Sequence, residues 1–438
     1  MAAASNYLDS YTSTAATLCG QDLPWLQQVR AAALTQFSAT GFPSPREEEW
    51  RYTNVSSIEK KLFAPSTVAD KASIDSALID RFRLADCWSV VLVNGRYDEA
   101  LSTLRGLPDD VVVTSLASAL EAYPDLVADN FGKAVSSEEH GFIAFNTASF
   151  TDGVFIHVPP KQVVNKPIQI LHYVNQPDSA AVTRQLVVLC ECAEISIIES
   201  FIGEGSAYLS DTVNEAIIGE NAALTWYKCQ CEADKAYHFG GTYANQADNA
   251  HLTHHNFAFG GLLARSDIHC NLNKAAECEL NGLYLGSNRQ HLDNHTRINH
   301  LQPHGISREL YKGVLDDRAR GVFQGRVIVA EDAQKTDSLM NNRNLLLSND
   351  AEADTKPQLE IYADDVKCGH GVTVGQLDEK SVFYLQSRCV DEETARNMLT
   401  FAFANEMVNK VKVKSLHDKV LEQVLLRFPQ EGVEKEWL

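Results

Sequence analysis

The fold is decided by a short stretch that occurs twice, NAALT at residues 221–225 and NAHLT 28 residues later at 249–253. A similar stretch, CAEIS at 192–196, lies 29 residues before the first copy. After the second copy, apolar and polar residues alternate again at 276–280. A degenerate period of this length, with apolar residues at alternate positions, is typical of the stacked coils of a β-solenoid. One coil cannot bury its apolar face alone, so stacked neighbours share one continuous core.

The region around these copies has the composition of strands. Helical periodicity largely disappears between residues 87 and 388, and short β-rich runs separated by Gly, Asn and Asp occupy residues 155–158, 168–174, 185–192, 195–198 and 224–227. The alternative is a β-sandwich, in which turn signals come about every 8–12 residues. The longer spacing favours the solenoid and leaves the sandwich open.

Helical patterns flank the β-rich region, so we divide the chain into an N-terminal helical region (1–86), a β-helix core (87–389) and a C-terminal helical region (390–438). Because the end of a solenoid exposes unpaired strand edges, we expect the C-terminal helices to cap it and to offer a docking surface. Three apolar helical stripes support the division: Trp25, Leu26, Val29, Ala33, Leu34 and Phe37; Ala395, Met398, Leu399, Ala402 and Phe403; and Leu416, Val420, Leu421, Val424, Leu425 and Phe428.

The charge balance excludes several classes of partner. The chain has 38 Lys and Arg against 58 Asp and Glu, a net charge of −20, which repels nucleic acid and anionic membrane surfaces. The N-terminus has no basic and apolar segments of a secretory signal, and no apolar run is long enough to span a membrane. We therefore expect a cytoplasmic protein whose ten cysteines are reduced.

Common catalytic motifs are missing from the sequence. It contains no P-loop, no nucleophile elbow and no HExxH motif. The stretch GHGVTVG at 369–375 lacks the third glycine of a dinucleotide loop and continues into β-branched residues. We therefore expect no catalytic residues.

Cysteine and histidine are concentrated at several places. The pairs Cys190/Cys192 and Cys229/Cys231 would each share one face of a strand, where they either pack in the core or bind a soft metal. Eight histidines fall within 54 residues, at 251, 254, 255, 269, 291, 295, 300 and 304, but their spacing matches no known ligand set. We expect the cysteines to pack, and the histidine-rich stretch leaves a dedicated metal site open.

The stretch DDVKCGHG at 364–371 is the strongest candidate site. Cys368 and His370 lie two residues apart beside a carboxylate pair, so N, S and O ligands for ferrous iron or zinc could converge there. Gly369 and Gly371 remove side-chain bulk next to the ligands. The alternative is a tight turn that contains a buried thiol.

This stretch also resembles the SufB/SufD scaffold family of the SUF iron–sulfur cluster assembly system. The similarity extends over nearly the whole chain, and its motifs are KPQLEIYADDVKC at 356–368 with HG at 370–371, FYLQSR at 383–388, GFP at 41–43 with EWRYT at 49–53, and NTA at 146–148 with FTDGVF at 150–155. SufB members have a ligand cysteine where this chain has KTDS at 335–338, and glutamates where it has Gly369 and Gly371. Both differences favour the SufD branch.

The resemblance implies a right-handed parallel β-helix between helical ends and a non-catalytic scaffold. It implies a heterodimer with SufB, SufC ATPase subunits on the C-terminal helices, and a nascent iron–sulfur cluster or Fe²⁺ shared with SufB. His370 matches the family's iron-binding histidine, and Cys368 is its nearby companion. Members of the machinery bind reduced flavin, for which this sequence locates no site.

A second hypothesis is a self-associating β-helix protein that binds iron through the histidine-rich stretch. A homodimer of the isolated chain is compatible with either hypothesis. Iron stoichiometry of the purified single chain separates the two hypotheses, since only the second expects bound iron.

Overall fold

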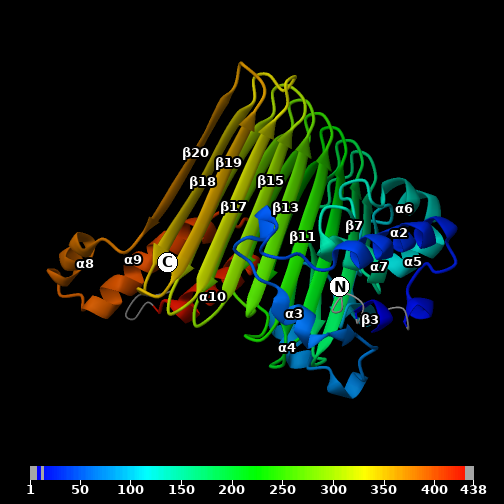
Figure 1. The fold of residues 1–438 in the computed structure, drawn as a ribbon, viewed down its shortest axis with the longest axis horizontal. Helices are drawn as coiled ribbons and strands as arrows, with labels where there is room; N and C mark the ends of the chain where they lie inside the picture. Colours follow the sequence, from blue (N-terminus) through cyan, green and yellow to red (C-terminus); the bar gives the residue numbers. More distant parts are fainter. Residues whose placement is uncertain (1–6, 11–13, 430–438) are drawn as a thin grey trace.

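The computed structural model describes residues 7–10 and 14–429, which form a flattened parallel β-solenoid with helices on its outer faces (Figure 1). Successive strands alternate between two ten-stranded sheets, and each strand pairs in parallel with the strand of the same sheet in the next coil. The sheets enclose one elongated apolar core. The parallel solenoid is therefore confirmed, and the sandwich is excluded.

The strands of the first sheet, here called sheet A, are joined in the order β19, β17, β15, β13, β11, β9, β7, β5, β4, with β1 beside β7. Their bounds are β1 Ala64–Pro65, β4 Val112–Ser115, β5 Val154–Val158, β7 Ser179–Leu189, β9 Leu209–Ile218, β11 Tyr237–Gln246, β13 Leu263–Leu272, β15 His291–His300, β17 Arg320–Val329 and β19 Glu352–Ile361.

The second sheet, sheet B, has the order β20, β18, β16, β14, β12, β10, β8, β6, β2, β3. Its strands are β2 Trp88–Val93, β3 Arg96–Thr103, β6 Ile168–Val174, β8 Glu194–Gly203, β10 Ala223–Gln230, β12 His251–Ala258, β14 Glu277–Gly286, β16 Ile306–Leu315, β18 Asp337–Leu346 and β20 Lys367–Gly375.

The sequence repeat corresponds to the turn that enters each strand of sheet B. Asn221 and Asn249 adopt φ of 55° and 56°, a left-handed conformation that Asn tolerates better than most residues. The alanine after each asparagine is fully buried, and Leu224 and Leu252 are register partners that face the core. The repeat thus encodes a turn, a small corner residue and a core residue in every coil.

The two ends of the solenoid are built differently. At the N-terminal end β3 pairs antiparallel with β2, and β4 pairs antiparallel with β5, so both sheets finish there in an antiparallel strand. At the other end β19 and β20 are the last strands of their sheets, and no further strand pairs with them in the described part of the chain. Their outer edges therefore present unpaired backbone groups.

Helices of the N-terminal half cover the outer face of sheet A. An apolar cluster joins helix α2 (Pro24–Thr40) and helix α7 (Gly141–Ser149) to β7, β9 and β11. The Arg265 guanidinium of β13 lies 3.6 Å from the Trp50 ring centre and pairs with Asp267 and Asp293, and Asp293 accepts a hydrogen bond from Thr53 (2.6 Å). The segment that joins α2 to α3 (Ser56–Lys61) is thereby fixed to the sheet.

Four helices lie inside the span 87–389 that we expected to be β-helix core. They are α5 (Leu116–Ala122), α6 (Pro124–Asn130), α7 and α8 (Glu379–Gln386), while α4 (Ser76–Phe82) precedes that span. Helix α7 is buried at nearly every position, so it lacks the amphipathic pattern by which a surface helix is predicted. Residues 146–148 of the motif quoted above lie in this helix, and β5 begins at Val154.

The C-terminal helices do not cap the open end, and that expectation was wrong. Helices α9 (Glu392–Val408) and α10 (Lys414–Arg427) pack on the outer face of sheet B, where Leu416, Val420 and Val424 lie with Phe257 and Leu283 in one apolar cluster. The outer face of a parallel sheet is itself apolar here and requires cover. No helix of the described residues is long and apolar enough to cross a membrane.

We predict that Leu280→Ala lowers the free energy of unfolding by about 2–5 kcal/mol, because Leu280 is fully buried in the solenoid core. Leu339→Ala is the matched control, since Leu339 is 46% exposed and its truncation is expected to cost within about 0.5 kcal/mol. Urea unfolding followed by circular dichroism measures both. Equal costs would contradict the assignment of the core.

Candidate functional site at the open end of the solenoid

Cys368 and His370 lie on β20, the edge strand of sheet B, and share its inward face. Cys368 is opposite Ser338, and His370 is opposite Met340. Cys368 is partly buried against the solenoid core, and burial raises the pKa of its thiol. His370 is exposed, so its imidazole is available at the open end.

The candidate stretch is an edge strand and not a tight turn. Gly369 and Gly371 point to the opposite face from His370, so the glycines do not make room around the imidazole as we expected. The carboxylate pair lies in the turn before β20, where Asp365 forms an ion pair with Lys335 of the previous coil. Cys368 and His370 therefore lie together on one face of β20, whereas the Asp365 carboxylate is paired with Lys335.

A hydrogen-bonded line of polar side chains extends from Cys368 into the solenoid. Ser338 lies opposite Cys368, and Ser307 donates a hydrogen bond to the Ser338 hydroxyl (2.8 Å). The imidazole Nε2 of His300 is 2.9 Å from the Ser307 hydroxyl. Burial lowers the pKa of His300 to about 4, so its ring is neutral near neutral pH.

A buried carboxyl group lies behind His370. Glu309 is the register partner of Met340, which in turn lies opposite His370. Glu309 is 3% exposed, and burial raises its pKa to about 8. A protonated carboxyl group at this position can donate a hydrogen bond, whereas an ionised one would be an uncompensated buried charge.

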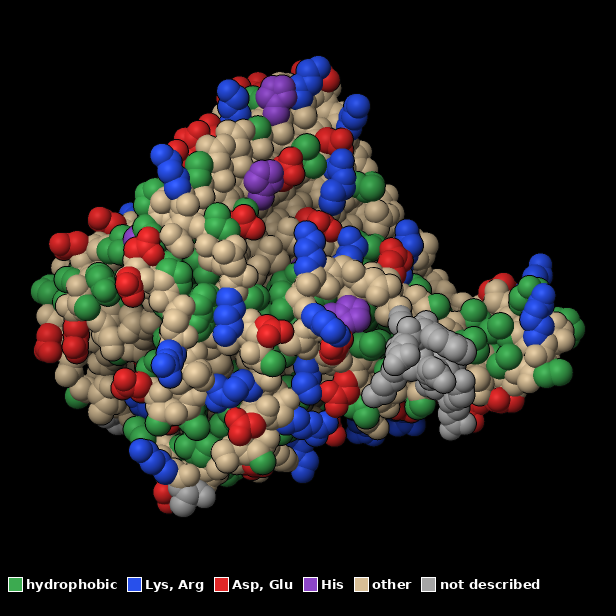
Figure 2. Space-filling view, turned by 180° about the vertical axis from the view of Figure 1, so that it is seen from behind, with side chains coloured by type: hydrophobic (Ala, Val, Ile, Leu, Met, Phe, Trp, Pro, Cys, Tyr) green, Lys and Arg blue, Asp and Glu red, His purple; other side chains and the backbone are tan. Residues whose placement is uncertain are grey.

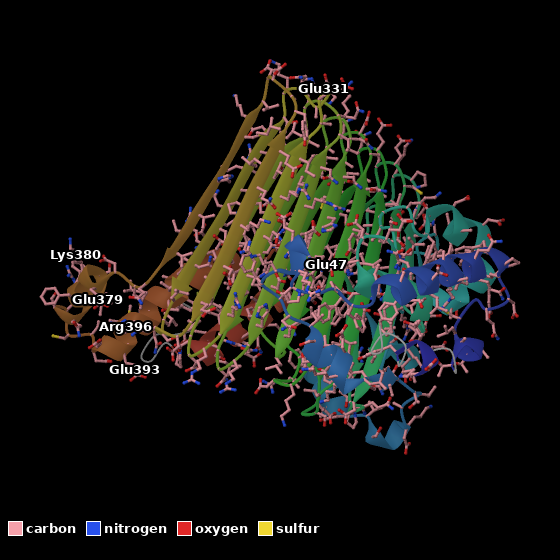
Figure 3. All side chains as sticks on the ribbon, viewed as in Figure 1. Glu47, Glu331, Glu379, Lys380, Glu393 and Arg396 are labelled. Atoms are coloured by element: carbon pink, nitrogen blue, oxygen red, sulfur yellow. The ribbon has the colours of Figure 1, made fainter. Side chains whose placement is uncertain are left out.

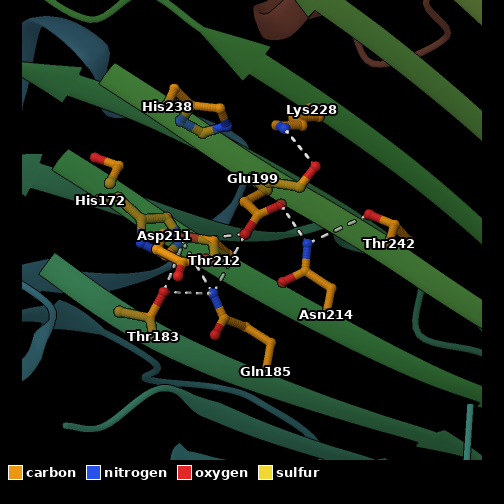
Figure 4. A network of polar contacts seen from close by, with 12 residues as sticks. His172, Thr183, Gln185, Glu199, Asp211, Thr212, Asn214, Lys228, His238 and Thr242 are labelled. Atoms are coloured by element: carbon orange, nitrogen blue, oxygen red, sulfur yellow. Dashed lines mark hydrogen bonds and ion pairs between the residues drawn. The ribbon is translucent and has the colours of Figure 1, made fainter. Parts of the chain in front are cut away.

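A second polar network lies inside the solenoid between β6 and β11, next to the apolar core (Figure 4). Glu199 of β8 lies 3.2 Å from the Nε2 of His172 and accepts a hydrogen bond from Asn214 (2.8 Å). Burial opposes ionisation of Glu199, but His172 and Lys228 outweigh burial and lower its pKa. Burial lowers the pKa of Lys228 to about 8, and its ammonium donates a hydrogen bond to Ser266 (2.9 Å).

Sequence reasoning missed these interior charges. In the run EISIIES at 194–200, Glu199 follows the core residues Ile195 and Ile197 at every second position, so all three side chains point to the same face of the strand. Applied residue by residue, that alternation would have placed Glu199 inside the solenoid. The same argument places Lys228 beside Glu199, because the two are register partners.

The histidine-rich stretch does not form one site. His254 and His300 face the interior of the solenoid. His255 is buried on the outer face of sheet B and stacks on Tyr227. Three more histidines of the stretch lie on the outer face of sheet A: His269, His291 and His295. His251 and His304 are exposed. In the part of the chain that the structure describes, no group of three or more His, Cys, Asp and Glu has the arrangement of a metal site.

The two cysteine pairs have different environments. Cys229 lies near the end of β10, beneath the C-terminal helices, and packs in their apolar cluster. Cys190 and Cys192 lie in a turn and not on a strand as we expected, with Cys192 at a φ of 58°. The thiol of Cys190 is 3.4 Å from the Nε2 of His157.

These features define a parallel β-solenoid protein whose candidate site is a thiol and an imidazole at an unpaired sheet edge. Comparisons with known proteins agree with this description. The family described as "SUF system FeS cluster assembly, SufBD core domain" matches residues 172–403, and "SufBD protein N-terminal region" matches residues 1–170. The two matches cover the solenoid and the N-terminal helices.

Individual relatives are similar along most of their length. The iron–sulfur cluster assembly protein SufD of Escherichia coli is 32% identical over 404 residues, which cover 90% of this chain and 92% of that protein. An iron–sulfur cluster assembly SufBD family protein of Synechocystis is 30% identical and covers 94% and 93% of the two chains. Protein ABCI7 of Arabidopsis thaliana, named as chloroplastic, is 28% identical and covers 91% and 85%.

The chain belongs to the SufB/SufD family of SUF iron–sulfur cluster assembly proteins. Within that family it is SufD-like, as the residues at 335–338 and around His370 had indicated. Family membership supports a role in SUF iron–sulfur cluster assembly.

The raised pKa of Glu309 predicts a pH dependence of stability. The pKa of Glu309 is about 8 in the folded chain, above the pKa of about 4.3 expected in the unfolded chain. The bound proton therefore contributes its full stabilisation when the pH is below the pKa of the unfolded chain. This stabilisation is lost as the pH rises towards the pKa of the folded chain. Glu309→Gln removes this dependence. Relative to the parent chain, the variant should therefore become more stable as pH rises from about 5 to about 8 in urea unfolding. A stability difference that is independent of pH would contradict a buried, protonated Glu309.

Proposed function

We propose that this chain is a non-catalytic scaffold subunit that pairs with SufB through the open end of its solenoid. The observation that carries the proposal is the asymmetry of the two ends. At one end the sheets finish in the antiparallel strands β3 and β4, of which β4 has only four residues. At the other end β19 and β20 continue the parallel coils and present outer edges of ten and nine residues that no further strand of the described chain covers. Unpaired edges are templates for strand addition, and a second solenoid can continue both sheets. Tyr362, at 63% exposure, and Val374, at 47%, add apolar surface there.

His370 is the iron ligand that this subunit contributes to the shared site. Its exposed imidazole offers one lone pair to a borderline metal such as Fe²⁺, which is the cargo of the assembly. The remaining ligands, chiefly thiolate, come from SufB. Cys368 lies on the same face of the strand, but its raised pKa and partial burial make it a less suitable iron ligand than His370.

The C-terminal helices are the docking surface for SufC. Helix α9 uses Phe401, Ala404 and Met407 to pack on the solenoid, so only part of the stripe that we predicted from the sequence faces solvent. Met398 and Leu399 of that stripe are partly exposed, and Ala402 is exposed. An apolar helix face that faces solvent is typical of a protein interface.

Helix α8 extends this surface away from the solenoid (Figure 1). Phe383 is 70% exposed and Tyr384 is 55% exposed, and hydrophobic side chains gather on the lobe formed by α8 (Figure 2). Arg396 of α9 forms an ion pair with Glu379 of α8 (2.8 Å), which fixes the two helices together (Figure 3). The aromatic pair therefore lies beside both α9 and the open end.

The hypothesis of a self-associating iron-binding protein receives less support, because the histidines are distributed over different faces of the solenoid. Flavin remains unassigned to any residues. We propose a cytoplasmic setting for the scaffold, in keeping with the bacterial relatives.

Replacing His370 should remove cluster formation and leave assembly intact. In a co-purified complex of SufB, SufC and this chain, His370→Ala should reduce bound iron and the cluster absorbance at least about tenfold, because a metal ligand is lost. His304→Ala is the matched control, since His304 is exposed in a turn of another coil. Normal cluster formation by the His370 variant would refute the ligand role, and loss of the complex would show that the histidine is structural.

Placing a charge on the outward face of α9 should weaken SufC binding. Ala402→Glu places a carboxylate in the docking surface and should raise the Kd for SufC about tenfold or more, equivalent to about 1.4 kcal/mol. Ala32→Glu makes the same change on an exposed position of α2 and should leave the Kd unchanged. Calorimetric titration measures both, and equal affinities for the two variants would place SufC elsewhere.

A further inference from the structure

Two cysteines meet where β10 ends beneath the last turn of α10. Cys229 and Cys231 are two residues apart and both point outward from sheet B, with their Sγ atoms 3.7 Å apart. Cys229 is 7% exposed, whereas Cys231 is partly exposed. Both contact the apolar cluster between sheet B and the C-terminal helices. Small molecules in solvent can therefore reach one thiol, and the second thiol is its immediate neighbour.

The end of α10 lies over this pair. Arg427 is the last residue of α10, and its guanidinium donates a hydrogen bond to the carbonyl oxygen of Phe259 (2.5 Å) in the neighbouring coil. Burial lowers the pKa of Arg427, while Cys231, Asp234 and Cys229 counteract burial. The thiol pair also shares its apolar cluster with Val424 and Phe428, so it packs directly beneath the last turn of α10.

We infer that Cys229 and Cys231 form a reversible oxidation site, at which a peroxide converts the two thiols to an intrastrand disulfide and loosens the last turn of α10. The inference concerns a modification that is separate from cluster assembly. It does not rest on the docking of SufC.

The chemistry balances with hydrogen peroxide as the oxidant. The Cys231 thiolate attacks one peroxide oxygen, the O–O bond breaks, and sulfenic acid and water form. The Cys229 sulfur then attacks the Cys231 sulfur, the S–OH bond breaks, and a disulfide and a second water form. A dithiol reductant returns both sulfurs to thiols by exchange.

The position at the strand end makes closure feasible and reversible. Two residues along a strand span about 6.4–6.8 Å, which is the upper limit for the Cα separation in a disulfide. Cys231 lies just beyond β10, which ends at Gln230, so the chain can contract there. A disulfide closed near that limit is strained and is therefore easier to reduce.

The other pair with the same spacing provides a matched control. The thiol of Cys190 contacts the His157 imidazole, whereas the thiol of Cys192 lies 3.9 Å from the Glu191 carboxylate. Sequence spacing is identical in the two pairs, and only Cys229 and Cys231 have their sulfurs in contact. Oxidation should therefore distinguish them.

The experiment treats the full chain with hydrogen peroxide, alkylates the remaining thiols and digests with trypsin. Cleavage after Lys228 and Lys235 releases one peptide that holds both cysteines. We expect this peptide to be lighter by two hydrogens and unalkylated, and dithiothreitol to restore alkylation. Cys231→Ser and Cys231→Ala should abolish the disulfide, and Cys192→Ser should not affect it.

Native trypsin digestion tests the effect on α10. Oxidation should make cleavage after Arg427 about threefold faster, because the contracted cysteine pair packs less well against the last turn of α10 and that turn opens more often. Cys231→Ser should show no such change. Equal disulfide formation in the Cys190/Cys192 pair, or overoxidation of Cys231 without a disulfide, would overturn the site. Unchanged cleavage after Arg427 in the oxidised chain would overturn the link to α10.

Discussion

The pairing of backbone groups between successive coils is the constraint on which the rest of the structure depends. Each strand of the solenoid gains its hydrogen bonds only from the coils before and after it, so the first and last coils require separate solutions. At the first coil the sheets finish in the antiparallel strands β3 and β4. At the last coil the parallel strands β19 and β20 have no strand partner on their outer edges in the described part of the chain, so the two ends of the solenoid differ. Cys368 and His370 lie on the edge strand β20, so the candidate site and the candidate interface occupy the same edge.

The interior tolerates charge because each coil supplies partners to the next. Glu199 lies beside His172 of the neighbouring coil and Asn214 of the opposite sheet. No single strand could therefore supply all the polar partners of its carboxylate. Such a network is costly if it is partly satisfied, and it therefore fixes the register of the coils that contribute to it. Glu309, nearer the open end, is accommodated differently, since burial raises its pKa to about 8 and keeps it neutral. The two buried carboxyl groups thus differ: Glu199 is ion-paired, whereas Glu309, which lies nearer the candidate site, is neutral.

Much of the fold follows from local sequence, because the repeat is local. Asn221 and Asn249 predict the turns, Leu224 and Leu252 predict the core, and the structure places them in register. Helix α7 escaped prediction because it is buried all round and has no polar face. For the candidate site, the sequence suggested Cys368 and His370, but it could not show that they lie on an edge strand, since edges are a property of the whole sheet. The position of α9 and α10 on sheet B was equally inaccessible, because their apolar stripes fit either a solenoid end or an outer face.

The central claim is that the open end of the solenoid is completed by SufB. Amide hydrogen exchange of the chain, alone and in complex with SufB, tests it most directly, because unpaired edge amides exchange rapidly until a new strand pairs with them. Residues 352–361 and 367–375 should gain protection in the complex, while β3 and β4 at the N-terminal end of the solenoid should be unchanged. Protection that appears at β3 and β4, with β19 and β20 still exchanging as in the isolated chain, would contradict it.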